Sequence, residues 1–217
     1  MSHERHLVTT EAGPVLSAEV ILPEAPTAAV VITHPHPLHG GSMHTPVPTA
    51  LFRRAGELGL AAVRFDFRGV GESTGTHDEG RGERDDVRAV MAWLRERLAE
   101  QGSPDVPVLL AGWSFGADVI LAVDDDVAGW FAVAAPLAIV PVDEMAAPAS
   151  EAQTVLVVPE HDQFRSPTAA AEVTADWQAT DIDVVTGVDH FLAGSLDRVA
   201  HAFERFVTTG TPGDVAG

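Results

Sequence analysis

The sequence of 217 residues contains no cysteine, so disulfides, thiolate metal sites and thiol redox chemistry are all excluded. It also contains no lysine: 13 arginines stand against 32 acidic residues, and the formal net charge is −19. A field of this sign repels nucleic-acid phosphates and anionic lipid headgroups, so we expect neither as a partner. No apolar run approaches the roughly eighteen residues of a membrane span, and the first residues lack the pattern of a signal peptide. The sequence therefore predicts a cytoplasmic protein.

One segment comes nearest to a basic patch. Its arginines are Arg81, Arg84 and Arg88. They are interleaved with three acidic residues, Glu83, Asp85 and Asp86. Residues three or four apart share one helix face and can form ion pairs there. We therefore expect a solvated, ion-paired helix face, not a nucleic-acid site.

The length fits a single α/β domain, which we place at residues 1–208, with a short tail at residues 209–217. Hydrophobic residues make up 46% of the sequence and aromatic residues only 6%, which predicts a core of Ala, Val and Leu. Two alternating segments, residues 5–10 and 16–22, predict an antiparallel hairpin at one edge of a sheet.

From residue 28 onward, continuous apolar runs alternate with helical patterns. Unbroken apolar runs are typical of parallel strands that are covered on both faces. They occupy residues 28–33, 61–67, 106–111, 130–135, 154–158 and 182–185. Helices are expected at residues 45–58, 83–100, 115–123, 167–178 and 195–207. The alternation predicts a doubly wound, mostly parallel sheet of the α/β class, and residues 136–153 are too few for a cap domain.

The segment Gly112-Trp113-Ser114-Phe115-Gly116 lies between a predicted strand and a predicted helix. A serine between two glycines in this context is typical of a nucleophile elbow, because side chains at the glycine positions would collide in so sharp a turn. The alternative is a tightly packed turn in which Ser114 only caps the helix. We interpret Ser114 as a nucleophile.

A serine nucleophile needs a base, and the base needs an acid that orients it. In a doubly wound sheet these groups lie just past the carboxyl ends of strands. Asp162 follows the run at residues 154–158, and His190 follows the run at residues 182–185. We predict Asp162 as the acid and His190 as the base, in the chain order Ser…Asp…His that accompanies this elbow.

Other residues compete for the two roles. Glu160 lies closer to the strand end than Asp162 and stays open as the acid. Asp189 adjoins His190, so its side chain should diverge from the ring. His161 is interpreted as a loop residue, and His201 as a solvated position of the last helix.

The oxyanion that forms during acyl transfer needs two N–H donors. One is expected from the backbone of Phe115, the residue after the nucleophile. The other should come from the loop at residues 34–41, which reads His-Pro-His-Pro-Leu-His-Gly-Gly. Because Pro35 and Pro37 have no N–H, His36 is the donor best placed, with Leu38 next.

The same loop allows a second interpretation. The spacing of His34, His36 and His39 resembles that of metallo-β-lactamase-like hydrolases, and imidazoles so spaced can bind zinc. That pattern has an aspartate where this chain has Leu38, and the strand–helix alternation does not suit that fold. We therefore expect no metal and no other cofactor.

The glycines near Arg68 are weaker evidence for a site. Residues 68–73 contain a Gly-x-Gly pair, but the sequence has neither a Gly-x-Gly-x-x-Gly motif nor the lysine of a phosphate-binding loop. We expect Arg68 and Asp66 to fix the shape of this loop by ion pairing.

With these residues together, the chain resembles the α/β-hydrolases. It is similar in particular to a small, lidless bacterial branch with a His-Pro-His-Pro-x-x-Gly-Gly loop and an Arg-Gly-x-Gly-x-Ser segment, here residues 34–41 and 68–73. The resemblance runs from about residue 28 to residue 206 and covers five motifs in order. It implies Ser114 as nucleophile, Asp162 as orienting acid, His190 as base, and His36 and Phe115 as oxyanion donors. Where the branch often has an aromatic residue before the glycine pair, this chain has His39.

These observations predict a serine hydrolase that cleaves small carboxylic esters or thioesters. Trp113 and Phe115 beside the nucleophile suggest apolar acyl groups of modest size. An acyltransferase would use the same residues with an alcohol or amine in place of water, a binding module would lack the reactive serine, and a zinc hydrolase would use the three histidines. Edge strands of such sheets can pair between subunits, so the sequence is compatible with a homo-oligomer.

Overall fold

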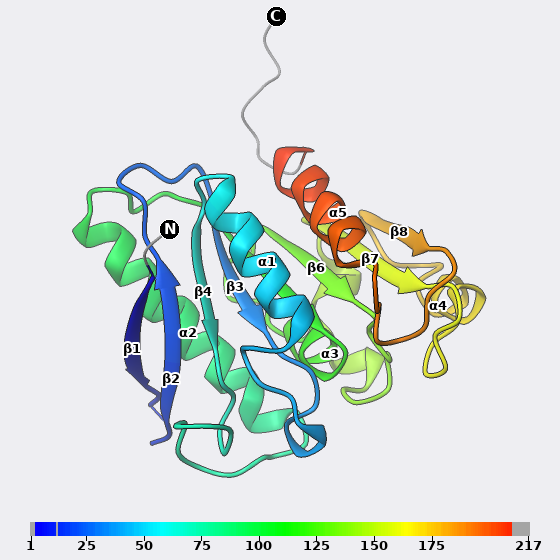
Figure 1. Ribbon diagram of the computed structural model, residues 1–217, viewed down its shortest axis with the longest axis horizontal. Coiled ribbons are helices and arrows are strands. Elements are labelled where there is room, and N and C mark those ends of the chain that lie inside the picture. Colours follow the sequence, from blue (N-terminus) through cyan, green and yellow to red (C-terminus); the bar gives the residue numbers. More distant parts are fainter. Residues whose placement is uncertain (1–2, 12, 210–217) are drawn as a thin grey trace, which may run out of the picture.

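The computed structural model describes residues 3–11 and 13–209, and its centre is an eight-stranded sheet (Figure 1). The strand order is β1-β2-β4-β3-β5-β6-β7-β8. The strands are β1 (Glu4–Thr9), β2 (Val15–Ile21), β3 (Ala29–Thr33), β4 (Ala61–Phe65), β5 (Val108–Trp113), β6 (Gly129–Val133), β7 (Gln153–Pro159) and β8 (Thr180–Val185). Only β2 is antiparallel to its neighbours, β1 and β4, and all other pairs are parallel. The predicted edge hairpin and the predicted parallel strands are both confirmed.

Helices cover both faces of this sheet. They are α1 (Pro46–Glu57), α2 (Arg81–Glu100), α3 (Phe115–Leu121), α4 (Pro167–Val173) and α5 (Leu196–Thr209). In Figure 1, α1 and α5 lie in front of the sheet and α2 lies behind it. Each face buries its own apolar cluster: Val30 and Ile32 pack with α1 and α5, whereas Ala29 and Val31 pack in the cluster of α2 and α3. Burial on both faces explains the unbroken apolar runs of the central strands. The run at residues 182–185 is an exception, because β8 lies at the edge of the sheet and only its Val185 is buried.

The fourth helix is shorter than predicted. The pattern favoured a helix over residues 167–178, but α4 ends at Val173 and turns follow it. The Gln178 N–H donates instead to Pro148 O at 3.0 Å, in the connection between β6 and β7, and the chain then enters β8. Pairing of β8 with β7 thus overrides the local helical pattern.

The connection from β6 to β7 contains no cap domain. It holds two single-turn 3₁₀ helices, Val142–Glu144 and Ala147–Ala149, as the short predicted gap requires. The predicted tail, residues 209–217, lies outside the described residues except for Thr209 at the end of α5, so the division at residue 208 stays a prediction. None of the helices in the described part of the chain is both long and apolar enough to cross a membrane.

The predicted ion-paired face of α2 is only partly exposed. Arg84 pairs with Glu144 at 3.0 Å and Arg88 with Asp125 at 2.7 Å, both near the surface. Glu83 and Asp86, however, are fully buried, so their prediction as solvated residues is wrong. They face inward because two loop segments, at residues 68 and 77–80, use their carboxylates.

The loop after β4 is held in a different way from the expected one. Arg68 does form an ion pair, but with Asp86 of α2, through Nη2 and Oδ1 at 2.7 Å. No ion pair of Asp66 is found in the described part of the chain; its Oδ1 accepts the Met43 N–H at 2.7 Å. Asp66 therefore joins this loop to the segment before α1, while Arg68 joins it to α2.

Candidate active site

The turn between β5 and α3 has the geometry of a nucleophile elbow. Ser114 has φ 55° and ψ −117°, a conformation that is costly for a residue with a Cβ. A Cβ on Gly112 would come within 2.5 Å of Thr33 Oγ1, and one on Gly116 within 2.5 Å of His34 O. The two glycines are therefore required by close packing against the end of β3, as the sequence predicted. The elbow lies between β3 and β5, where the strand order reverses and parallel sheets place their sites.

Folding brings the predicted nucleophile, base and acid together. His190 Nε2 lies 2.9 Å from Ser114 Oγ, and His190 Nδ1 lies 2.8 Å from Asp162 Oδ2. A carboxylate oxygen can only accept, so Nδ1 carries the proton and the Nε2 lone pair faces the serine hydroxyl. Asp162 and His190 are buried and Ser114 is half-buried. The arrangement can remove the proton from the hydroxyl as it attacks an acyl carbon.

The competing residues lie elsewhere. Glu160 Oε2 accepts the Gly187 N–H at 2.7 Å at the surface, and the Asp189 carboxylate accepts the Phe191 N–H at 3.0 Å. His161 and His201 are both exposed. The structure therefore places Asp162, and not Glu160, against His190.

Asp162 is itself fixed by the turn that follows it. Its Oδ1 accepts the backbone N–H groups of Phe164, at 2.8 Å, and Arg165, at 3.1 Å. This leaves Oδ2 for the imidazole. One carboxylate thus both shapes the turn after β7 and orients His190.

The two predicted oxyanion donors lie near the serine: Phe115 follows it in the chain, and His36 lines the same cavity. Within the described part of the chain, the N–H groups of His36 and Phe115 donate to no other residue. The loop that carries His36 is tightly closed: the Gly41 N–H donates to His36 O at 3.1 Å, and the Leu38 N–H donates to His36 Nδ1 at 3.2 Å. Leu38 therefore uses its N–H within the loop, so of the two candidates only the His36 N–H has no acceptor among the described residues.

Imidazole rings surround the predicted donors. The His36 ring stacks on His39 with centroids 4.4 Å apart and lies 5.1 Å from His77 and 5.0 Å from Phe115. Burial lowers the pKa of His36, the neighbouring His39 and His77 lower it further, and Glu83 opposes them. His77 in turn lies with Nδ1 2.8 Å from the buried Glu83 carboxylate. His36 is thus favoured in its neutral form beside the site.

The three histidines of the zinc interpretation do not converge. Both ring nitrogens of the fully buried His34 are engaged: Nδ1 donates to Pro35 O at 2.6 Å, and Nε2 accepts the Phe67 N–H at 3.0 Å. His34 therefore has no lone pair to offer in common with His36 and His39. Across residues 3–11 and 13–209, no three His, Asp or Glu side chains are grouped as metal ligands would be.

The buried His34 makes a testable contribution to stability. Burial lowers the pKa of His34 to about 4, against a partly opposing effect of its hydrogen bond to Pro35 O. Between the ordinary pKa near 6.5 and that value, the unfolded chain binds a proton that the native protein does not. We therefore expect His34 to lower the free energy of unfolding by about 3 kcal/mol as the pH falls from near 6.5 to about 4.

Urea unfolding at pH 7 and at low pH measures this effect. Compared with the wild type, His34→Gln should be less stable at pH 7, because it loses well-aligned buried hydrogen bonds, yet its stability should fall less on acidification. Since the other titrating groups are shared, the difference between the two proteins isolates His34. Parallel pH curves for the two proteins would contradict the assignment.

A cavity of about 500 Å³ opens directly on the serine. Its lining comes from the loops after β3, β5, β7 and β8, together with the end of β5 and the start of α1: Pro35, His36, His39, Gly40, Gly41, Thr45, Pro46, Trp113, Ser114, Phe164, His190 and Phe191. No Asp, Glu or Arg belongs to this lining. The cleft is therefore apolar and aromatic, with imidazole as its only titratable chemistry.

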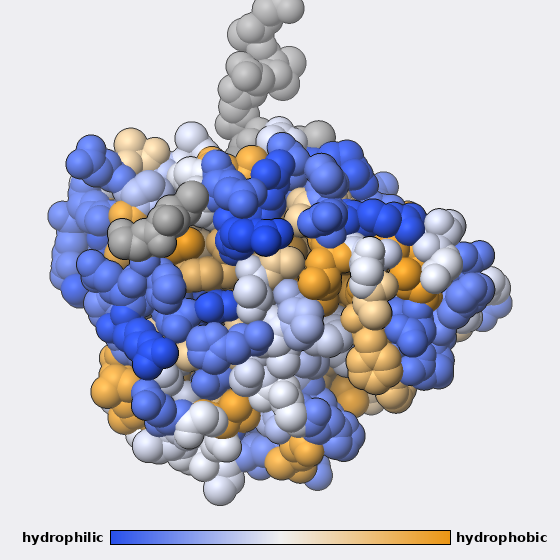
Figure 2. Space-filling view, viewed as in Figure 1, coloured by the Kyte–Doolittle hydropathy of each residue, from blue (hydrophilic) through white to orange (hydrophobic). Residues whose placement is uncertain are grey.

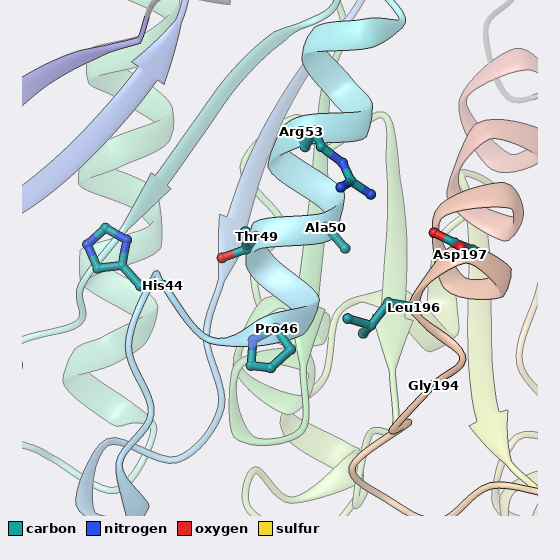
Figure 3. Close-up of a pocket in the computed structure, with 8 residues that line it drawn as sticks. All are labelled: His44, Pro46, Thr49, Ala50, Arg53, Gly194, Leu196 and Asp197. Atoms are coloured by element: carbon teal, nitrogen blue, oxygen red, sulfur yellow. The ribbon is translucent and has the colours of Figure 1, made fainter.

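A second hollow of about 420 Å³ lies beside the first, between α1 and the start of α5 (Figure 3). Arg53 of α1 and Asp197 of α5 extend toward it from opposite sides, and Pro46 borders both cavities. It contains no nucleophile paired with a base, so the chemistry belongs to the first cavity.

Two residues that support the site were not predicted. Asp118, fully buried on α3, accepts three N–H groups in succession, from Leu137, Ala138 and Ile139, at 2.8–2.9 Å. Burial raises the pKa of Asp118, and these N–H groups lower it. Arg165 donates to Pro136 O at 2.9 Å and so joins the same loop to the turn that carries Asp162. The sequence contains one sign of such a role, for Asp118: it is the single charged residue in the apolar segment that follows the elbow, residues 115–123.

Comparisons with known proteins agree with this architecture. The family model described as X-Pro dipeptidyl-peptidase (S15 family) matches residues 12–205. The chain is similar to the structure of an α/β serine hydrolase homologue from Coxiella burnetii, with 31% identity, a TM-score of 0.81, and coverage of 94% of this chain and 97% of that one. It is also similar to a lidless α/β serine hydrolase from Xanthomonas campestris, with 30% identity, a TM-score of 0.85, and coverage of 99% and 97%. An uncharacterized protein of Rickettsia prowazekii is 39% identical over 101 residues, which span 46% of this chain and only 40% of that relative.

Proposed function

This chain belongs to the X-Pro dipeptidyl-peptidase (S15) family and has the fold of the lidless α/β serine hydrolases, and from that premise we propose that it cleaves small carboxylic esters or thioesters through an acyl-enzyme on Ser114. The observation that supports the proposal is the continuous contact from Asp162 through His190 to Ser114, at 2.8 and 2.9 Å. The role of each residue within this hydrolase is part of the proposal.

The proposed reaction has two halves. Ser114 Oγ attacks the acyl carbon while His190 Nε2 takes its proton, and the N–H groups of His36 and Phe115 stabilise the oxyanion. The tetrahedral intermediate collapses, the carbon–oxygen or carbon–sulfur bond breaks, and His190 returns the proton to the leaving alcohol or thiol. A water molecule, deprotonated by His190, then attacks the acyl-enzyme and releases the carboxylic acid and the free Ser114 hydroxyl. No cofactor enters the balance.

The family's description names a dipeptidyl-peptidase, but the lining of this cleft favours ester substrates over peptides. An enzyme that removes dipeptides from a chain end must accommodate a cationic amino group, and a carboxylate is its natural partner. The described cleft lining contains no Asp or Glu. Uncharged acyl compounds therefore fit it better than peptides with a free N-terminus.

Labelling with a fluorophosphonate tests the proposal. The reagent phosphonylates a serine only where a base activates the hydroxyl, so one adduct is expected and peptide mapping should locate it on Ser114. Chelators should leave both labelling and ester hydrolysis unchanged. An unlabelled protein, or an adduct on another serine, would refute the proposed nucleophile.

Acyl transfer on the same residues is the second candidate, because the open cleft admits acceptors other than water. Turnover of an ester in the presence of a competing alcohol separates the two activities. Hydrolysis predicts the free acid as the main product, whereas a dominant new ester would identify a transferase.

A further inference from the structure

Two of the most exposed aromatic side chains of the described residues lie at the cleft. The described part of the chain has five large apolar side chains that remain exposed: Leu7, Leu38, Phe164, Val184 and Phe191. Phe164 and Phe191 line the cavity of Ser114, although 61% and 56% of each is exposed, and Leu38 belongs to the loop of His36. Elsewhere, hydrophilic residues dominate the face seen in Figure 2, with apolar residues in small groups between them. Apolar rings left in water beside a reactive serine point to a ligand that covers them.

The two phenylalanines are held in register with the predicted triad. The Phe164 N–H donates to Asp162 Oδ1, and Phe191 directly follows His190. Their rings meet the His190 imidazole edge-on, with centroids 4.6 Å away for Phe164 and 5.7 Å for Phe191. We define these two rings as the aromatic rim. Its position relative to His190 is set by the same turns that position the acid and the base.

Contact with His190 decides which part of a substrate the aromatic rim would meet. In the proposed reaction the leaving oxygen must come within hydrogen-bond reach of Nε2 to receive its proton, so the alcohol portion leaves alongside the imidazole. The carbonyl oxygen, in contrast, is assigned in the proposed reaction to the N–H groups of His36 and Phe115, so it does not compete for the place beside the imidazole. The rim therefore flanks the path of the alcohol.

The charge of the site narrows the chemistry of that alcohol. The described lining has no Arg, Asp or Glu to pair with an ionised group, and the chain as a whole carries a formal charge of −19, which disfavours anions. Phenyl rings at a cleft rim offer faces and edges for stacking against a second ring. The alcohol that fits this site is therefore neutral and apolar, and an aromatic alcohol fits it better than an aliphatic one.

On the basis of the proposed esterase function, we infer that Phe164 and Phe191 form a leaving-group subsite that selects esters of uncharged aromatic alcohols. The acyl group stays on Ser114 when the alcohol leaves past His190, so these rings do not select it. The subsite is thus a specificity determinant for the alcohol, separate from the groups that carry out the chemistry.

Three esters separate the alcohol from the acyl group. Methyl acetate and benzyl acetate share an acyl group and have alcohols of similar acidity, whereas methyl phenylacetate places the ring on the acyl side. The quantity measured is the ratio of kcat/KM for each aromatic ester to that for methyl acetate. We expect the wild type to have a higher kcat/KM for benzyl acetate than for methyl acetate. Phe164→Ala and Phe191→Ala should each lower this ratio by about tenfold, which is the effect expected from losing one aromatic contact and the apolar area that it buries.

The matched control is Leu7→Ala, which removes an equally exposed apolar side chain from β1, at the far edge of the sheet. It should leave every ratio and every rate unchanged. An unchanged benzyl ratio in both phenylalanine variants would overturn the inference, and so would a loss confined to methyl phenylacetate.

A binding measurement keeps this inference separate from the proposed reaction. Saturation-transfer NMR with benzyl alcohol on Ser114→Ala does not require turnover, so it reports on the subsite even if no ester is hydrolysed. We expect a signal that weakens when Phe164→Ala is added and persists when Leu7→Ala is added instead. If benzyl alcohol does not bind to Ser114→Ala with both phenylalanines in place, the subsite is refuted. If the wild-type protein is not labelled by the fluorophosphonate, only the proposed nucleophile is refuted.

Discussion

Replacing Ser114 with alanine is expected to lower kcat for ester hydrolysis by at least about 10⁵-fold, since the attacking oxygen is then missing altogether. The substitution removes one hydroxyl at a half-buried turn, whose only side-chain partner among the described residues is His190 Nε2. The free energy of unfolding should therefore change by less than about 1 kcal/mol. Initial rates on an acetate ester, together with urea unfolding, measure both quantities.

Ser103→Ala is the matched control, because Ser103 lies in the turn before β5, at the opposite end of that strand from the elbow. Its activity should equal that of the wild type. Substantial turnover by Ser114→Ala in a folded protein would mean that another group attacks the substrate.

Asp162→Asn should produce the second largest loss, about 10⁴-fold in kcat. The asparagine can keep its carbonyl oxygen on the N–H groups of Phe164 and Arg165, where Oδ1 now lies. Its amide nitrogen would then face His190 Nδ1 and, as a donor, favour the tautomer with the proton on Nε2. That tautomer cannot accept the proton of Ser114.

Glu160→Gln provides the comparison for this experiment. Glu160 lies two residues away in sequence, but its carboxylate accepts the Gly187 N–H and lies near His161 at the surface, so its variant should retain nearly full kcat. Circular dichroism and thermal unfolding establish that both variants are folded. A larger loss in Glu160→Gln than in Asp162→Asn would transfer the role of the acid to Glu160.

The local elements of this protein could be predicted because they depend on short stretches of sequence. Runs such as residues 28–33 are apolar at nearly every position, which is typical of a short strand covered on both faces. The elbow was equally visible, since Gly112 and Gly116 are needed wherever a chain turns so sharply beside another strand. The helix expected at residues 167–178 is confirmed only to Val173, because turns at residues 174–179 lead the chain into β8 and its pairing with β7.

Side-chain partners across the fold could not be predicted in the same way. Several acids lie near Arg68 in the sequence, and the one it pairs with is Asp86, eighteen residues away on α2. In the sequence, Asp118 is a single charged residue in the apolar segment after the elbow, with no evident partner. In the structure, the loop at residues 137–139 supplies three N–H donors to its carboxylate. These pairings depend on how whole elements pack.

The sequence by itself determined the α/β alternation, the sharp turn at Ser114 and the candidates for acid and base, because glycine sterics and apolar periodicity act over a few residues. Only the tertiary structure decided that Asp162 and not Glu160 contacts His190, and that Phe164 and Phe191 lie against the imidazole. It also decided that both ring nitrogens of His34 form hydrogen bonds within the protein. These outcomes follow from the order of β3, β5, β7 and β8 in the sheet, which brings loops distant in sequence to one edge.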